Sequence, residues 1–189
     1  LGLSKCKGDY IAFCDCDDYW IAEDKLEKQL KYMKNNTGCS LCVTKVFTRT
    51  GSINKGMIYP DEITYDKLLK GNAYLHAQSY FMRKSFFDKY IDFESFVTKF
   101  NVWDYPIVLE LIQHSYFYCL DFYSAVFVKS KESFTQTQSR LKRFKYIIGS
   151  YKIRFYYIFK YGCKINTVLY LLYKLIRDTY SIIFKCWYK

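Results

Sequence analysis

The pattern of apolar and polar residues predicts short strands and amphipathic helices in alternation. The mostly apolar run at residues 9–15, DYIAFCD, is typical of a buried strand. In the next stretch, Leu26, Leu30 and Met33 recur at helical spacing. Acidic residues precede this stripe and Asn-Asn-Thr-Gly follows it, so we predict an amphipathic helix that ends near residue 36.

The same alternation continues toward the C-terminus. We predict strands at residues 39–50, 72–84 and 116–128, and helices at residues 63–72 and 103–114, with a helix or loop at 84–93. Strands and helices in this order predict an α/β sandwich whose sheet is mixed and mostly parallel. In such sheets the ligand crevice lies at the carboxyl ends of the strands.

Charge divides the chain into two parts. Residues 1–139 hold 17 Lys and Arg and 17 Asp and Glu, whereas residues 140–189 hold 12 Lys and Arg and only one acidic residue, Asp178. The entire formal net charge of +11 therefore lies in the C-terminal segment. We predict a domain at residues 1–139 and a basic, aromatic, helical tail at residues 140–189.

The tail mixes Lys and Arg with Tyr, Phe, Ile and Leu. Ile165, Leu169, Leu172 and Ile176 form a stripe at helical spacing. Such a segment fits peripheral contact with an anionic membrane, packing on the rest of the chain, or binding to nucleic acid, which is the least favoured of the three. We expect no membrane-spanning helix, because no run of 18 apolar residues occurs.

Eight cysteines raise the question of zinc or disulfides. Cys14 and Cys16 flank an aspartate in a predicted strand, and Cys39 and Cys42 lie in the next apolar run, with no histidine near either pair. We therefore predict buried thiols in a reducing cytosol.

The acidic cluster Asp15-Cys16-Asp17-Asp18 follows the first predicted strand. Three carboxylates this close repel one another unless a cation or solvent screens them. Mg²⁺ and Mn²⁺ prefer carboxylate oxygens and bridge them to phosphates, so the cluster is a candidate metal site. The alternatives are a solvated acidic loop, or Asp18 as the cap of the following helix.

The order of several motifs is more specific than any one of them. Over residues 1 to about 135 the chain contains, in this order, the motifs KGDYIAFCDCDDYW, KLEKQL, KLLKGN, WDYPIVLEL and AVFVKSKES. In this order the chain resembles the family 2 glycosyltransferases of the GT-A fold. The resemblance implies a nucleotide-diphospho-sugar donor and a D-x-D metal site at Asp15 and Asp17. The second aspartate would coordinate Mg²⁺ or Mn²⁺ at the diphosphate, and the first would contact the ribose or support the metal, with Asp18 as a further candidate.

The resemblance also implies a general base in an x-D motif that opens a helix, which corresponds to Asp104. The alternative role for Asp104 is a helix cap, and a helix N-terminus would keep its carboxylate ionised. Trp103 and Tyr105 beside it are candidates for stacking on a sugar or for core packing. His76 lies in the predicted strand that borders the acceptor site in this family.

Two departures from the family pattern stand out. Phe127 and Val128 replace a Tyr-Arg pair, which removes a cation near the diphosphate or acceptor. The first strand and further βα units of the family, which grip the nucleotide base, do not precede Leu1. We therefore expect an N-terminally truncated member that contains the C-terminal portion of a GT-A domain.

From these features we predict a glycosyltransferase of cell-surface polysaccharide synthesis. It would move a sugar to a glycan or polyprenyl-linked acceptor by metal-assisted inverting displacement, in the cytoplasm at the inner face of the cell membrane. The alternative is a truncated, inactive remnant or a membrane-associated accessory protein.

Overall fold

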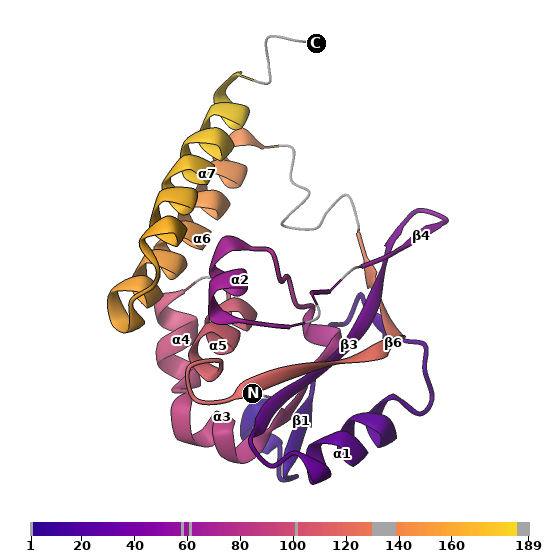
Figure 1. The fold of residues 1–189 in the computed structure, drawn as a ribbon. Coiled ribbons are helices and arrows are strands. Elements are labelled where there is room, and N and C mark those ends of the chain that lie inside the picture. Colours follow the sequence, from indigo (N-terminus) through magenta and orange to yellow (C-terminus); the bar gives the residue numbers. More distant parts are fainter. Residues whose placement is uncertain (1, 58, 61, 101, 130–138, 185–189) are drawn as a thin grey trace.

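A mixed β-sheet separates two layers of helices (Figure 1). The computed structural model describes residues 2–57, 59–60, 62–100, 102–129 and 139–184. The strands are β1 (Tyr10–Ala12), β2 (Tyr19–Trp20), β3 (Cys39–Thr50), β4 (Ile53–Gly56), β5 (Phe81–Arg83) and β6 (Tyr116–Val128). They are ordered β1-β5-β3-β6-β2, and β4 forms a hairpin with β3. The predicted α/β class with a mixed sheet is confirmed.

The parallel share of the sheet is smaller than predicted. Strands β1, β3 and β6 run in one direction, as expected for an α/β fold. However, β5 lies between β1 and β3 and is antiparallel to both. In the described part of the chain, only β3 and β6 therefore form a parallel ladder, while β2 and β4 pair antiparallel with their neighbours. The sheet is mixed, and most of its ladders are antiparallel.

The helices are α1 (Lys25–Asn35), α2 (Tyr65–Lys70), α3 (Lys84–Tyr90), α4 (Phe93–Lys99), α5 (Asp104–Leu111), α6 (Arg140–Tyr161) and α7 (Ile165–Phe184), with 3-10 turns η1 (Leu3–Lys5) and η2 (Ala77–Ser79). Alternate side chains of β3 serve the two faces of the sheet. Leu41 and Val43 pack into the main core together with α2, α5 and α6. Cys42 between them packs with Met33 of α1. Helix α1 thus covers one face, and the other helices cover the opposite face (Figure 1).

The predicted strand at residues 72–84 is wrong except at β5. Residues 77–79 form η2 instead, because side chains satisfy the backbone carbonyls that a ladder would use. The Trp20 indole donates to the Gln78 carbonyl at 2.9 Å, and the Gln29 amide donates to the Ser79 carbonyl at 2.9 Å. Helix α4 was not predicted, although Asp92 caps it by accepting from the backbone N–H of Ser95 at 3.2 Å.

Helix α1 forms where predicted, and two of its three stripe residues face the sheet, since Met33 is fully buried and Leu30 packs against the same core. Leu26 is exposed, and the buried side chains are those of Lys25, Gln29 and Met33. The Lys25 amine donates to the Gln29 Oε1 at 2.8 Å and lies 4.4 Å from the centre of the Trp20 ring. This hydrogen-bonded pair compensates for the cost of placing two polar side chains against the sheet.

The predicted helical tail consists of α6 and α7, which lie side by side (Figure 1). Both helices pack on the rest of the protein, because Tyr157 of α6 and Leu171 of α7 are fully buried in the main core. In the described part of the chain no helix is long and apolar enough to cross a membrane. The division into domains at residue 139 stays a prediction.

Candidate active site

Residues 15–18, which we call the acidic segment, link the two opposite edges of the sheet. This segment leaves the carboxyl end of β1 at one edge and enters β2 at the other. Asp15 and Asp17 are exposed on this crossing, whereas Asp18 is buried. The segment therefore lies past the end of β1, where the sequence places a ligand crevice.

Two hydrogen bonds hold the far end of the acidic segment. The backbone N–H of Val128, at the carboxyl end of β6, donates to the Asp18 Oδ1 at 2.9 Å. The Trp20 indole donates to the Gln78 carbonyl of η2. Asp18 thus neither caps α1 nor points its bonded oxygen toward a ligand, since that oxygen fixes the segment to β6.

The carboxylates of the segment repel one another. Partial burial and the charge of Asp17 both raise the pKa of Asp15. Burial raises the pKa of Asp18 to about 6, which the Val128 N–H partly opposes and the Asp17 and Asp15 charges reinforce. Burial and mutual repulsion thus both act against the charged forms of Asp15 and Asp18.

Asp104 lies close to this segment although it belongs to α5. Trp103 stacks on Phe13 with their ring centroids 5.0 Å apart, and Phe13 lies two residues before Asp15. Asp15 and Asp104 interact electrostatically, and this interaction raises the pKa of Asp104. The structure thus brings together the predicted base and the first aspartate of the predicted metal site.

The environment of Asp104 differs from the one expected at a helix N-terminus. The backbone N–H of Tyr105 donates to the Asp104 Oδ1 at 2.8 Å and lowers the pKa of Asp104, as expected. Burial has the larger, opposite effect, so the pKa of Asp104 is raised from its ordinary value. Asp104 is the first residue of α5, and Trp103 occupies the N-cap position without a side-chain hydrogen bond.

Trp103 and Tyr105 are both engaged in packing. Trp103 stacks on Phe13, as described above. The Tyr105 hydroxyl donates to the Leu68 carbonyl at 2.9 Å, and the Arg154 guanidinium lies 5.1 Å from the centre of its ring. These contacts fix the start of α5 and therefore the position of Asp104.

His76 is buried beside the acidic segment. Its ring lies 4.8 Å from the ring of Tyr74 and 4.7 Å from that of Phe127, centroid to centroid. Phe127 precedes Val128, whose N–H holds Asp18. Burial, reinforced by the charge of Lys129, lowers the pKa of His76 to about 4, so the ring is neutral at physiological pH. Its Nε2 is buried and has no hydrogen-bond partner among the described residues.

Sequence reasoning missed three tyrosines at this site. Burial raises the pKa of Tyr74 and of Tyr80, and the charges of Asp104 and Asp15 reinforce this rise. Tyr146 of α6 interacts with Asp104. The tail therefore reaches the candidate site, which its composition alone did not indicate. The KSKES stretch of the last motif lies mostly outside the described residues.

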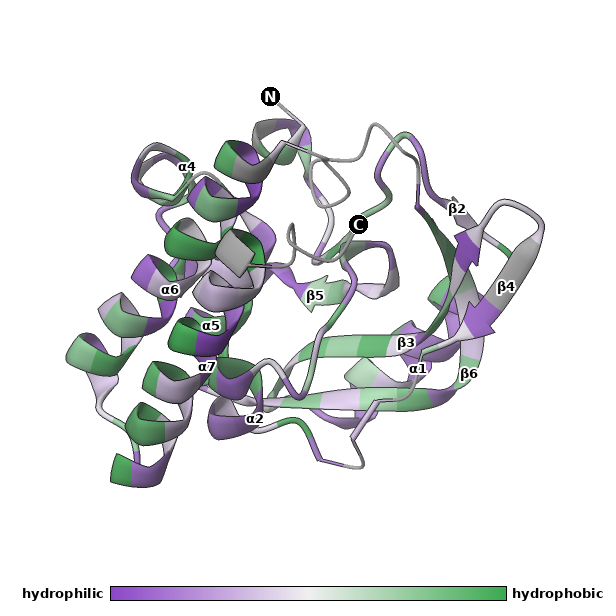
Figure 2. Ribbon diagram, turned by 90° about the horizontal axis from the view of Figure 1, so that it is seen from above, coloured by the Kyte–Doolittle hydropathy of each residue, from purple (hydrophilic) through white to green (hydrophobic). Residues whose placement is uncertain are grey.

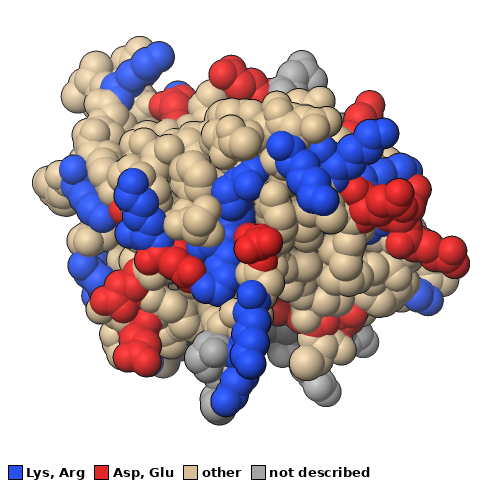
Figure 3. Space-filling model, turned by 90° about the horizontal axis from the view of Figure 1, so that it is seen from below, with Lys and Arg blue, Asp and Glu red and all other residues tan. Residues whose placement is uncertain are grey.

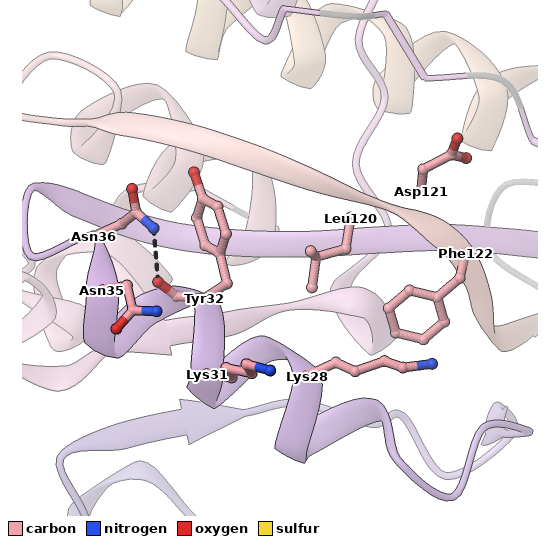
Figure 4. A pocket seen from close by; sticks show the side chains of 8 residues that line it. All are labelled: Lys28, Lys31, Tyr32, Asn35, Asn36, Leu120, Asp121 and Phe122. Carbon is pink, nitrogen blue, oxygen red and sulfur yellow. Dashed lines mark hydrogen bonds between the residues drawn. The ribbon is translucent and has the colours of Figure 1, made fainter.

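A separate groove of about 360 Å³ lies between α1 and β6 (Figure 4). Lys28 and Lys31 extend along it from α1, and the Lys28 amine lies 4.6 Å from the centre of the Phe122 ring. None of the candidate residues lines this groove. We therefore place the candidate site at the acidic segment.

The donor set at the acidic segment suits a hard divalent cation. Asp15 and Asp17 offer exposed carboxylate oxygens, which Mg²⁺ and Mn²⁺ prefer. In the described ranges no group of three or more His, Cys, Asp or Glu side chains gathers into a complete metal cage. Mg²⁺ commonly takes one or two carboxylates and completes its shell with phosphates and water, so two aspartates are a sufficient protein contribution.

Cys39 and Cys42 are buried as predicted, whereas Cys14 and Cys16 are exposed.

Comparison with known proteins adds independent evidence. Residues 1–91 match the sequence profile of glycosyl transferase family 2, and this match ends before Asp104. The chain is 38% identical over 71 residues to the putative teichuronic acid biosynthesis glycosyltransferase TuaG of Bacillus subtilis, covering 36% of this chain and 27% of TuaG.

Two further relatives match shorter or similar stretches. The UDP-Glc:alpha-D-GlcNAc-diphosphoundecaprenol beta-1,3-glucosyltransferase WfgD of Escherichia coli is 41% identical over 69 residues, 36% of this chain and 26% of WfgD. An uncharacterized glycosyltransferase of Haemophilus influenzae is 61% identical over 36 residues, 19% of this chain and 14% of the relative. The matches thus span about a quarter or less of the length of these relatives.

Proposed function

We propose that the protein transfers a sugar from a nucleotide diphospho-sugar to a glycan or lipid-linked acceptor, because residues 1–91 match glycosyl transferase family 2. The observation that carries this proposal is the stack of Trp103 on Phe13, which links the start of α5, where Asp104 lies, to the strand end that precedes Asp15. TuaG is named for teichuronic acid biosynthesis and WfgD for a diphosphoundecaprenol-linked acceptor, which supports a role in polysaccharide synthesis.

At the donor side, Asp15 and Asp17 would hold Mg²⁺ or Mn²⁺ together with the donor diphosphate. A bound metal supplies Lewis-acid stabilisation of the departing nucleoside diphosphate. Burial and, after it, the neighbouring charge of Asp17 raise the pKa of Asp15, and a bound cation would relieve the repulsion between the two carboxylates. Asp18 has a positioning role, because it fixes the segment to β6 through Val128.

At the acceptor side, Asp104 would act as the general base of an inverting displacement. It takes the proton of the acceptor hydroxyl as that oxygen attacks the anomeric carbon. A base needs a pKa above that of an ordinary aspartate to hold this proton, and burial of Asp104 provides the shift in that direction.

His76 would bind an acceptor hydroxyl through its Nε2. A neutral imidazole presents one donor and one acceptor nitrogen, and this nitrogen is buried without a partner among the residues described. We place the enzyme in the cytoplasm at the inner face of the cell membrane, where a polyprenyl-linked acceptor would be found.

The experiment compares turnover and donor binding in two variants of the protein that carries this chain. Nucleotide diphospho-sugars are screened with Mn²⁺ for binding by calorimetry and for nucleoside diphosphate release. We expect Asp104→Asn to bind the donor as the wild type does and to lose turnover by about 100-fold or more. Asp17→Asn should lose both metal-dependent donor binding and turnover.

Asp121→Asn is the matched control, because Asp121 is an exposed carboxylate outside the candidate site. It should leave binding and turnover unchanged. Wild-type turnover in Asp104→Asn would exclude this residue as the base. Failure of every donor to bind the wild type would favour the inactive accessory protein.

A further inference from the structure

The side of α7 that faces the protein buries Leu171 and also makes polar contacts. The Lys174 amine donates to the Lys70 carbonyl at 2.8 Å, and the Tyr151 hydroxyl donates to the Asp178 carboxylate at 3.2 Å. The Thr167 hydroxyl, fully buried, donates to the Asp66 carboxylate. These polar contacts orient α7 on α2 and α6.

The opposite side of α7 is apolar and exposed. Six side chains on it are between 43% and 70% exposed: Ile165, Leu169, Leu172, Tyr173, Ile176 and Tyr180. We call them the α7 stripe. Their spacing places them on one helix face, and within the described part of α7 no charged residue lies between them on that face. The predicted stripe at Ile165, Leu169, Leu172 and Ile176 is therefore real, and it points away from the core.

A helix normally turns such a stripe inward, because burial of apolar surface stabilises the fold. Exposed apolar surface that extends along a helix of about 30 Å marks an interaction site. Green bands recur along α7 in Figure 2, next to helix α6. The stripe therefore needs a partner that offers a long apolar surface.

The charge around the stripe selects the partner. Exposed Lys164 precedes the stripe, and exposed Arg177 flanks it and pairs with Asp178 at 2.9 Å. Residues 140–189 carry 12 basic residues and one acidic residue, whereas both signs mix on the underside of the molecule (Figure 3). A second copy of the chain would bring the same positive charge to the interface and would be repelled. An anionic lipid surface attracts this charge and accepts the apolar stripe.

We infer that the α7 stripe lies on an anionic membrane surface, with the axis of α7 parallel to it. Leu169, Leu172 and Ile176 enter the boundary between headgroups and acyl chains, while Tyr173 and Tyr180 lie at headgroup level. This inference deepens the proposed function, on which it rests for the identity of a lipid-linked acceptor. Binding to vesicles is measured without donor or acceptor, so its result is independent of whether the protein transfers a sugar.

The test is co-sedimentation of the whole chain with vesicles. Vesicles of phosphatidylglycerol and phosphatidylcholine are compared with vesicles of phosphatidylcholine alone. The wild type should bind the anionic vesicles more tightly, and added salt should weaken this binding. The double variant Leu169→Gln with Ile176→Gln should bind at least about 10-fold more weakly, because two apolar side chains that enter the membrane are lost.

The matched control is Leu26→Gln with Val97→Gln, which changes two exposed apolar side chains on α1 and α4. The control should bind as the wild type does, and circular dichroism should show that both double variants are folded. Equal binding by the stripe variant and the wild type would overturn the inference. Failure of the wild type to bind anionic vesicles would also overturn it. A wild-type dimer in sedimentation equilibrium that the stripe variant does not form would do the same.

Discussion

The burial of His76 predicts a measurable pH dependence of stability. We consider the variant His76→Phe, which keeps a ring between Tyr74 and Phe127 and removes both ring nitrogens. The wild-type Nε2 is buried without a hydrogen-bond partner in the part of the chain that the structure describes. At pH 8 the variant should therefore be as stable as the wild type, or more stable by up to about 1 kcal/mol.

The difference should grow as the pH falls. The pKa of His76 is about 4 in the folded protein against an ordinary value of 6.5. Below pH 6.5 the unfolded wild type gains a proton that the folded state does not, so the free energy of unfolding of the wild type falls. Each pH unit costs about 1.36 kcal/mol, so at pH 5 the loss amounts to about 2 kcal/mol. The variant has no such loss.

The assay is urea denaturation of both proteins, followed by circular dichroism from pH 8 to pH 5. His114 and every carboxylate are present in both proteins, so their titration cancels in the difference. We expect the variant to gain about 2 kcal/mol over the wild type between pH 7 and pH 5. Parallel stability curves would show that His76 titrates as an exposed histidine does, and would remove its role as a neutral partner of the acceptor.

Three further substitutions test how the site is held. Asp18→Ala should lower the free energy of unfolding by about 1–2 kcal/mol relative to Asp18→Asn, whose amide oxygen can still accept the hydrogen bond from β6; equal stabilities would contradict this role. Arg154→Met should cost about 1–2 kcal/mol by thermal denaturation, because it loses the hydrogen bond to the Leu69 carbonyl and two ring contacts. Glu110→Gln should cost about 1–3 kcal/mol in urea, because its buried carboxylate binds the Lys160 amine through both oxygens; a cost near zero would leave this pair without a role in docking α6.

The sequence predicted those elements whose local signals agree with their packing. The helix at residues 63–72 has a Thr64 cap and ends at Gly71, whose positive φ of 74° favours glycine, and the structure contains α2 there. The helix that opens at Asp104 and the long strand at residues 116–128 were also found.

The remaining features depend on contacts between distant segments. A stripe at helical spacing defines a face of α7 but does not say whether that face meets the core, so the orientation of Leu169 and Ile176 was not predictable. On α1 the polar pair Lys25 and Gln29 is buried, whereas Leu26 of the predicted stripe is exposed. Sequence spacing likewise gave no sign that Tyr146 of the tail approaches Asp104.

The direct test of the central claim is Mn²⁺ binding by the chain, measured by electron paramagnetic resonance with and without UDP. We expect that the wild type binds Mn²⁺, that UDP tightens this binding, and that Asp17→Asn weakens it about 10-fold or more while Asp121→Asn does not. Equal Mn²⁺ affinity in Asp17→Asn and the wild type would contradict the assignment of the acidic segment as the donor-metal site.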